Sequence, residues 1–478
     1  MTPPARERWG FLLLLLLTLL ALLPSDPQGP FDARDWRPAQ GVELHFPVWG
    51  ALIEPLSAPG QALAGEPDVR IAAVATLLWI TALATFCTLY RRWRREGSFR
   101  PIHLGYALGN GGIAAGMFLA YLCFALLVPL PSWTLITTDP ELVVADLQTH
   151  TVYSHDGLVT PQQNLALHRA RGFDVVAFTE HNNPSGTETS TAASRDDDER
   201  FPWAIPGTEV REPGDAFVLA VGWVPSRPEW TRQWLDHLER HPVIALAWRL
   251  SVADVHRLAA DGITGFEIAN AGHPDIPLPV RDAILAEARN RNLVLVASSD
   301  WHGWGGFWRT WTTVRVPDAQ RLSRSEKAEA VVDALRQRRV EEIQPVVAGY
   351  LGPPSTWQTL FAPFSAALRY GMELSPPRLA AWWVWGALYL LAATWLRSRG
   401  WRPLPLLGAT LLGISGAGVL LQGIRLSTLS LPGMTAGETL TEVGGWALAI
   451  GASTLLGALL MFRRGREPRA RRNRTSAR

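Results

Sequence analysis

The stretch Val144–Gly157, VADLQTHTVYSHDG, combines the pattern of a buried strand with side chains of the kinds that bind metals. Its apolar start leads into a polar segment that contains Gln148, His150, His155 and Asp156. Side chains two positions apart point the same way along an extended strand, so residues 148 and 150 share a face. Imidazole and carboxylate groups suit Zn, Mn or Fe(II). The stretch therefore predicts a strand that runs into a metal site.

The region from Leu142 to Val347 alternates short apolar runs with amphipathic stretches of helical period. Such alternation predicts an α/β fold with a mostly parallel sheet, either a barrel or a doubly wound sheet. Two of the amphipathic stretches begin at Thr160 and Ser251, residue types that are preferred at helix N-caps. The predicted strands are 142–148, 174–180, 216–223, 242–248, 265–270, 293–300 and 312–316.

Polar side chains of metal-binding type cluster where these predicted strands end. A single histidine at a strand end is usually solvated or hydrogen-bonded. In a parallel barrel, however, the carboxyl ends of all strands meet on one face, where active sites are built. Because several separate segments supply ligand types at this position, we expect one shared site. Its candidate members are His150, His181, Glu209, Glu267, Asn270, Asp300 and His302.

Composition narrows the class of protein. The chain of 478 residues is long enough for two or three domains, and its net charge of +2 gives no indication of nucleic-acid binding. The two cysteines, Cys87 and Cys123, both lie in apolar runs. They offer the soluble part neither a disulfide framework nor a zinc site, so any metal must be held by His, Asp and Glu.

Apolar segments predict an α-helical membrane domain of about six spans. Five segments are long enough to cross the hydrocarbon core, which takes ~20 helical residues. A shorter run, Phe11 to Leu23, is either a signal peptide or an uncleaved anchor. No small-residue cleavage site follows it, which favours the anchor. The five long segments are 71–90, 104–129, 379–396, 404–424 and 443–462.

Arginine-rich blocks predict the orientation. Residues 91–96, 397–402 and 463–474 each follow an apolar segment. Cytoplasmic loops are enriched in Lys and Arg, so these blocks and both termini are expected in the cytoplasm. The region 131–378 then lies outside it. In a bacterium, this predicts a multi-pass protein of the inner (plasma) membrane whose soluble domain is on the periplasmic or extracellular side.

Two short segments resemble each other. WGALIEPLSA (49–58) and WQTLFAPFSA (357–366) share W-x-x-L-x-x-P-x-S-A, and each precedes a span, an arginine block and another span. Either chance or a duplicated unit, an interfacial segment followed by two spans, explains this. The predicted domains are an N-terminal membrane half (1–130, with an anchor at 11–23 and an interfacial segment at 46–62), an extracytoplasmic domain (131–350), a C-terminal membrane half (351–462, with an interfacial segment at 356–372) and a basic cytoplasmic tail (463–478).

Region 142–340 resembles the PHP family, the polymerase and histidinol phosphatase superfamily of metallohydrolases. DLQTHTVYSHDG is similar to the family's first motif, D-L-H-x-H-T-x-x-S-D-G. TEH (179–181), GTE (207–209) and SDWH (299–302) are similar to the later motifs T-D-H, G-x-E and S-D-x-H. The resemblance implies a distorted (β/α)7 PHP-type barrel, one to three divalent ions (Zn, Mn or Fe) and a hydrolase that acts on phosphoesters.

The resemblance also implies a set of metal ligands. Glu209 would bridge two ions. One extra residue between Ser154 and Gly157 leaves open whether His155 or Asp156 is the ligand in the first motif. Carried over by position, the ligands are Gln148, His150, His155 or Asp156, His181, Glu209, Asp300 and His302.

Two departures from the family pattern suggest a weaker site. Gln148 stands where the family has its first histidine, and Trp248 replaces the histidine of a later A-H-P motif. Gln ligates weakly through its oxygen, and Trp does not ligate. His241 and His273 are candidate substitutes, although each is more often an ordinary loop residue. The alternative function is therefore a degenerate domain that binds or senses a ligand with little or no catalysis.

A catalytic site would work through further residues. Two ions ~3.5–4 Å apart would activate a water and clamp a phosphoryl oxygen. His302 or His155 would protonate the leaving group. Arg249 or Arg309 would bind an anionic group of the substrate.

The membrane part predicts an anchor rather than an ion pathway, because charged residues such as Arg425 and Glu442 lie at the edges of the spans. The expected partners are the lipid bilayer and a small-molecule or cell-envelope phosphoester. The long polar loop 182–205 is either a mobile lid beside His181 or a disordered insert.

Overall fold

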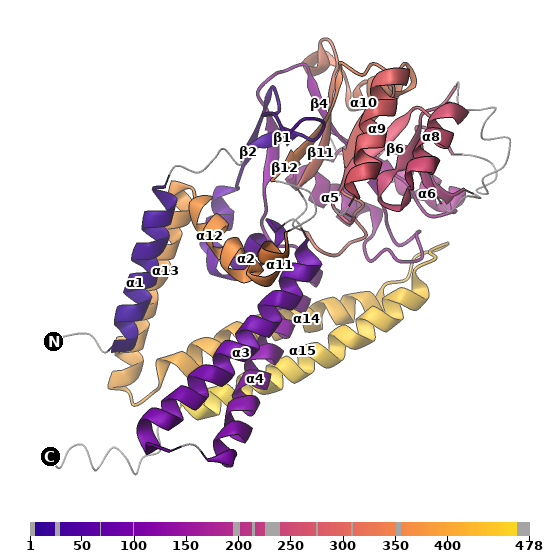
Figure 1. Ribbon diagram of the computed structural model, residues 1–478. Helices are drawn as coiled ribbons and strands as arrows, with labels where there is room; N and C mark the ends of the chain where they lie inside the picture. Colours follow the sequence, from indigo (N-terminus) through magenta and orange to yellow (C-terminus); the bar gives the residue numbers. More distant parts are fainter. Residues whose placement is uncertain are drawn as a thin grey trace.

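The computed structural model shows a curled α/β domain that stands on a group of long helices (Figure 1). It describes residues 5–23, 29–66, 68–98, 100–194, 201–212, 216–224, 240–273, 276–306, 309–349 and 355–465. Most of the predicted basic tail and residues 195–200 of the predicted lid loop lie outside these ranges.

A ten-stranded sheet forms the core of the α/β domain, in the order β1-β12-β11-β4-β5-β6-β7-β8-β9-β10. The pairs β4–β5, β5–β6, β8–β9 and β9–β10 are parallel, and the other five pairs are antiparallel. The prediction of a mostly parallel sheet is therefore wrong, because β7 and β11 both run against their neighbours. A mixed α/β fold is confirmed, and the (β/α)7 barrel stays a prediction.

The strands of this sheet are mostly short and buried. A separate antiparallel pair, β2 (Val42–His45) and β3 (Thr134–Thr137), lies outside it. The ten strands are β1 (Pro30–Asp32), β4 (Leu142–Thr149), β5 (Val175–Phe178), β6 (Trp203–Arg211), β7 (Phe217–Val221), β8 (Val243–Leu246), β9 (Gly265–Asn270), β10 (Val294–Ser298), β11 (Thr310–Arg315) and β12 (Ile343–Ala348).

Helices cover the sheet and begin at the predicted signals. Thr160 and Ser251 each accept a hydrogen bond from the backbone N–H three residues later, as N-cap residues do. One helix, α6, lies within the predicted lid loop and buries Thr187 and Ser190. The helices are α5 (Pro161–Ala170), α6 (Pro184–Ala192), α8 (Val252–Asp261), α9 (Leu278–Arg291) and α10 (Arg324–Arg336).

The sheet curls until its two parallel parts meet. The backbone N–H of Asp300, just after β10, donates to the carbonyl of Gln148 in β4 at 3.0 Å. The N–H of His150 donates in turn to the carbonyl of Trp301 at 2.9 Å. The carboxyl ends of β4 and β10 are thereby brought together, so residues far apart in sequence meet at one place.

Five helices are long and apolar enough to cross a membrane, which indicates a membrane protein. They coincide with the five long apolar segments of the sequence. The shorter α1 (Ala5–Ala21) lies along α13, and Trp383 of α13 donates to Thr18 at 3.0 Å. Six spans and their orientation stay predictions. The five helices are α3 (Val69–Glu96), α4 (Pro101–Leu127), α13 (Pro376–Ser398), α14 (Pro403–Thr428) and α15 (Gly437–Gly465).

The two similar segments fold alike and exchange contacts. The first forms η1 (Val48–Ile53) and α2 (Glu54–Ala64), and the second forms α11 (Thr356–Leu360) and α12 (Ala362–Met372). Trp79 of α3 donates to the carbonyl of Leu360, and Trp385 of α13 donates to that of Leu52. Leu52 and Leu360 are corresponding positions, so each segment packs on the span of the other half. This reciprocity favours duplication over chance.

Candidate metal centre

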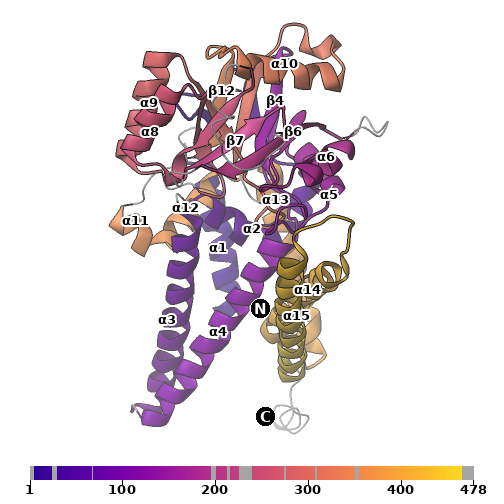
Figure 2. The ribbon, with the colours of Figure 1, turned by 90° about the vertical axis from the view of Figure 1, so that its right-hand side faces the viewer.

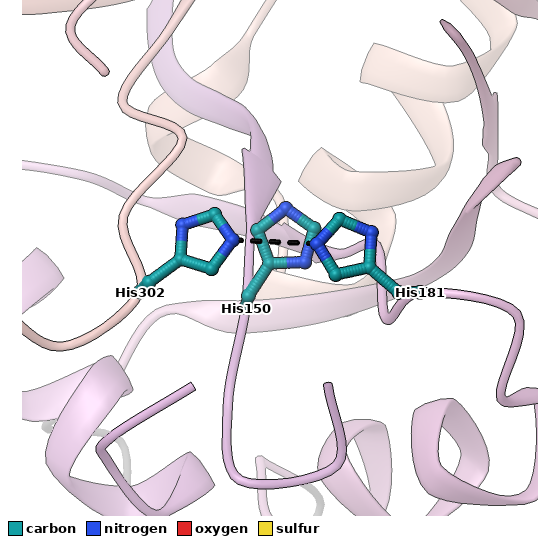
Figure 3. Close-up of side chains that lie close together, drawn as sticks. All are labelled: His150, His181 and His302. Carbon is teal, nitrogen blue, oxygen red and sulfur yellow. Dashed lines mark hydrogen bonds between the residues drawn. The ribbon is translucent and has the colours of Figure 1, made fainter. Parts of the chain in front are cut away.

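Three histidines from three different loops face one another in the curl of the sheet (Figure 3). His150 follows β4, His181 follows β5, and His302 follows β10. The ring of His150 stacks against both of the others, with centroid distances of 4.3 Å to His181 and 4.2 Å to His302. The Nε2 atoms of His181 and His302 are 3.4 Å apart. These three side chains could hold a metal ion.

Two buried carboxylates face His150 from the other side. The Nε2 atom of His150 is 3.3 Å from Glu209 Oε2 and 3.3 Å from Asp300 Oδ1. These three residues form a second group that could hold a metal ion. Asp300 adopts a positive φ of 50°, an unusual backbone conformation for a residue other than glycine. Strained conformations of this kind concentrate at functional sites.

Hydrogen bonds orient the ring of His150. The Ser154 hydroxyl is 2.7 Å from Glu180 Oε2, to which it donates, and it lies 3.1 Å from His150 Nδ1. Because that hydroxyl proton is committed to Glu180, Ser154 accepts from Nδ1–H of His150. A neutral His150 then presents the lone pair of Nε2 to two carboxylates. A lone pair that faces two carboxylates is repelled unless a cation lies between the ring and the carboxylates. Among the described residues, this Nε2 has no hydrogen-bond partner.

His302 is oriented in the same way, with one ring nitrogen hydrogen-bonded and the other facing a carboxylate. Its Nδ1 lies 2.8 Å from the carbonyl of Asp300 and donates to it, which leaves the lone pair on Nε2. That Nε2 is 3.4 Å from the Asp156 carboxylate, which also lies 3.5 Å from His181 Nε2. Two acceptor groups again face each other across a short gap. The donor set, imidazole and carboxylate with the second ring nitrogen anchored, fits a divalent ion of the Zn, Mn or Fe kind.

Gln148 lies between the same carboxylates as His150. Its Nε2 donates to Glu209 Oε2 at 2.7 Å and to Asp300 Oδ1 at 3.0 Å. The amide of Asn270 donates to Gln148 Oε1 at 3.3 Å and to Glu267 at 2.8 Å. Gln148 therefore supplies two N–H donors where a histidine would supply a lone pair for a metal.

The remaining predicted residues differ in how close they come to the centre. His155 is 72% exposed, and its ring centre is 5.2 Å from that of His181. With Asp156 and His181 it forms a third group that could hold an ion. Arg249 lies over the ring of Trp248 at 4.8 Å. The structure thus places His155 and Asp156 at the centre, whereas the contacts of Arg249 are with the rings of Trp248 and Phe217.

Arg309 lies elsewhere. It is buried, its Nη2 donates to the carbonyl of Gln61, and it forms an ion pair of 3.6 Å with Glu373. Gln61 and Glu373 both belong to the membrane part, so substrate binding by Arg309 stays a prediction without support from these contacts. Of the two arginines, Arg249 lies nearer to the candidate ligands, because it packs on Trp248, which stacks on His273.

Of the two candidate substitute ligands, His273 lies at the centre. Its ring stacks on Trp248 with centroids 3.8 Å apart, and its Nε2 is 3.8 Å from Asp300 Oδ2. His241 stacks on Trp223 at 4.7 Å. Trp248 therefore supports a nearby histidine, although it cannot itself bind an ion.

A buried network that the sequence pattern did not reveal supports the ligands. Glu180 accepts hydrogen bonds from Ser154, from Ser190 at 2.8 Å and from the backbone of Thr151 at 3.1 Å. On the other side of β4, His168 lies 2.7 Å from Asp146, to which Ser299 also donates. Glu180 immediately precedes His181, and Asp146 is part of the DLQ motif. In the sequence, only the position next to a candidate ligand or motif residue could have indicated the roles of Glu180 and Asp146.

Burial and charge shift pKa values in the centre. Burial lowers the pKa of His150, but the adjacent carboxylates of Asp300 and Glu209 outweigh this effect, and the pKa lies well above its ordinary value. Burial acts to raise the pKa values of the Glu209 and Asp300 carboxyl groups. The neighbouring histidines outweigh it and hold both pKa values below their usual range. Burial also raises the pKa of Glu267 well above its usual range. In the absence of a metal, these shifts favour a proton between His150 and the carboxylates.

Comparison with known proteins adds little beyond this geometry. No protein-family model and no curated protein matches the sequence. Among solved structures, the chain is similar to PsfC from Pseudomonas syringae, with 14% identity over 49% of this chain and 100% of PsfC and a TM-score of 0.32. It is also similar to an amidohydrolase from Chromobacterium violaceum with bound sulfate and no metal, with 16% identity over 39% of this chain and 96% of the other and a TM-score of 0.28.

Proposed function

We propose that this chain is a membrane-anchored, metal-dependent hydrolase of the PHP type that acts on phosphoesters. One observation carries the proposal: His150 Nε2 is buried without a hydrogen bond, 3.3 Å from the carboxylates of Glu209 and Asp300. The four motifs that resemble the PHP family converge on this point.

The residues of the chain divide the work between them. His150, Glu209 and Asp300 would hold one ion, and His181, His302 and Asp156 would hold another. Bound divalent ions supply an acidified water and stabilise charge on phosphoryl oxygens. His155, exposed at the edge of the centre, can carry a proton to the leaving oxygen. Arg249 beside Trp248 can bind an anionic substituent.

The orientation is part of the proposal. The C-terminal ends of α3, α13 and α15, which carry arginine-rich segments, lie at the end of the helix group away from the sheet (Figure 1). The positive-inside rule then places the sheet outside the cytoplasm. Alkaline phosphatase and fluorescent-protein fusions at residue 200 test this, and fluorescence there would contradict it.

The hydrolase proposal is tested with the full chain in detergent. The chain is loaded with Mn²⁺ or Zn²⁺ and assayed on p-nitrophenyl phosphate and on bis(p-nitrophenyl) phosphate. We expect rates at least about 100-fold above those of an H150A/D300A variant, since loss of ligands removes the metal. Equal rates for the two chains would rule out the enzyme.

A second function is favoured by one observation. The amide of Gln148 donates to both carboxylates, so part of the charge that a metal would balance is already hydrogen-bonded. A domain of this kind would bind or sense a ligand without turnover. Metal content by plasma mass spectrometry separates the two functions: two equivalents per chain favour the hydrolase, and one or none favours binding.

A further inference from the structure

The loop that carries the first metal motif rests on the hairpin between α14 and α15. The N–H of Thr435 donates to the carbonyl of Val152 at 3.1 Å, and its hydroxyl donates to that of Tyr153 at 2.6 Å. The hydroxyl of Thr439 donates to the carbonyl of His155 at 2.7 Å. Candidate metal ligands and the outer end of a membrane hairpin are thus joined by direct hydrogen bonds.

Apolar packing strengthens this junction. One buried cluster joins side chains of the metal loop to side chains of the hairpin. Arg425, near the end of α14, donates to the carbonyl of Leu158 at 3.1 Å and to Gln163 at 2.7 Å. The buried members of the cluster are Val152, Tyr153, Leu158, Leu426, Ala436 and Leu440.

Two further loops of the centre meet other membrane helices. Arg70, in the first turn of α3, donates to the carbonyl of Gly272 at 2.9 Å. A Cβ added at Gly272 would lie 2.9 Å from Asp300 Oδ2, so this contact is at the edge of the centre. Gly305, three residues after His302, donates its N–H to the carbonyl of Leu126 near the end of α4 at 2.9 Å.

The loops that surround the metal centre therefore lie at the level where the spans end. The loops after β4, β9 and β10 meet the long helices, whereas α10 lies at the far end of the sheet domain (Figures 1 and 2). Trp304, two residues after His302, is 52% exposed at this level. Tryptophan is enriched at membrane interfaces, where its ring meets lipid headgroups. Exposed Arg70 adds a cation that suits phosphate.

We propose that the substrate reaches the centre from the adjacent leaflet of the bilayer and is a lipid phosphoester. This inference rests on the proposed hydrolase function. The headgroup layer occupies roughly 5–8 Å beyond the hydrocarbon core, which matches a site one hydrogen bond away from the ends of α3, α4 and α14. Arg70 and Trp304 hold the headgroup and the glycerol region, and the tails remain among the spans.

The reaction is a simple hydrolysis. The oxygen of water bonds to phosphorus, the bond from phosphorus to the leaving oxygen breaks, and a proton goes to that oxygen. A lipid p-nitrophenyl phosphodiester would give a lipid phosphate monoester and p-nitrophenol. No oxidant, reductant or other reactant is needed.

The first test compares two substrates that differ only in their tails. Dioleoyl-glycero-phospho-p-nitrophenol lies in the bilayer, and the dibutanoyl compound stays in water. For the metal-loaded full chain in liposomes, we expect kcat/KM to be at least about tenfold higher for the long-chain compound, since partitioning delivers it to the site. W304S should lower the ratio of the two values about tenfold, because the interfacial anchor is lost.

A matched control is W446S, which removes another exposed tryptophan from the lipid-facing surface of α15. It should leave the ratio unchanged. If the two compounds are hydrolysed equally and W304S has no effect, leaflet access is overturned while the hydrolase stands. If neither compound is hydrolysed although bis(p-nitrophenyl) phosphate is, the lipid substrate is overturned.

A second measurement does not depend on activity. An environment-sensitive NBD label at W304C is quenched by brominated lipids only if this position reaches the bilayer. A label at W446C gives the value for a lipid-facing position, and one at E329C on α10 gives the value for water. Quenching at position 304 close to the W446C value supports the inference even if the hydrolase proposal fails. Quenching equal to that at E329C overturns it.

Discussion

At the scale of single residues, His150 shows how a proton and a metal compete for one place. Its Nδ1 is committed to Ser154, and its Nε2 faces Glu209 and Asp300. The raised pKa of His150 favours a proton at this place in the metal-free folded chain. Any metal must displace that proton, so binding is coupled to pH.

This coupling predicts how metal stabilisation changes with pH. A raised pKa stabilises the metal-free fold below the unfolded value of about 6.5, and the contribution is lost as the pH rises through the folded pKa. The affinity for the metal rises over the same pH interval, because fewer protons compete for His150. The difference in Tm between the Mn²⁺-loaded and the EDTA-treated chain should therefore grow as the pH rises above about 6.5. For an H150A chain, this difference in Tm should depend little on pH. A difference that shrinks as the pH rises would contradict the assignment of His150 as a metal ligand.

Gln148 supports a second prediction at this scale. A Q148H/W248H variant replaces two N–H donors with a ligand nitrogen and restores the histidine pair of the family pattern. We expect bound metal to rise by about one equivalent per chain, measured by plasma mass spectrometry, because both carboxylates are then free to ligate. Q162H, the same substitution at an exposed position of α5, is the control. An unchanged metal content would favour a site that has lost its second ion for good.

At the scale of elements, the loop between β4 and α5 is held by close backbone packing. A Cβ at Gly157 would lie 1.8 Å from the carbonyl oxygen of Thr151, which cannot move without displacing His150 or Asp156. Each side of this loop supplies a candidate ligand. The loop therefore tolerates no side chain at position 157.

G157A should destabilise the chain by about 3 kcal/mol and reduce metal binding, because overpacked sites relax at the expense of their neighbours. Thermal unfolding and metal content in detergent measure the two effects. G306A is the matched control, since the nearest atom to its added Cβ is 3.7 Å away, an ordinary contact. Equal stability of the two variants would show that the loop adapts.

The sequence predicted some elements well and others poorly, for physical reasons. Strands β4 and β10 each begin with four apolar residues in a row, so the local pattern was sufficient. Strand β6 was missed because Pro206 and Gly207 interrupt its run, and with it the antiparallel β6–β7 hairpin. Strand β1 has three residues and pairs with β12, more than 300 positions away, so no local signal marks it.

In the candidate site too, the sequence predicted some residues and not others. Ligand types at strand ends marked His150, His181, Glu209, Asp300 and His302 as neighbours, and the structure brings them together. Their supports had no pattern to reveal them, because a buried hydrogen-bond network depends on tertiary contacts. Substrate binding by Arg309 was inferred from residue type alone, and its neighbours proved to be Gln61 and Glu373.

At the scale of the whole molecule, the two membrane halves are joined by a buried ion pair. Arg378, at the start of α13, contacts Glu54 of α2 at 2.6 Å, and their side chains are 1% and 0% exposed. Arg378 also donates to Gln61 and lies over the ring of Phe46 at 4.4 Å. The two similar segments also exchange the tryptophan hydrogen bonds to Leu52 and Leu360, so this ion pair lies where the two membrane halves contact each other.

R378M should therefore be strongly destabilising. It leaves Glu54 buried without its partner, and breaking one side of a buried pair costs about 3–5 kcal/mol. Thermal unfolding of the full chain in detergent measures the loss. The double variant E54L/R378M removes both charges and should recover most of the stability, since an apolar pair of similar volume is often neutral. If the double variant is no more stable than R378M, the hydrogen bonds of Arg378 to Gln61, rather than its charge balance with Glu54, hold the two halves together.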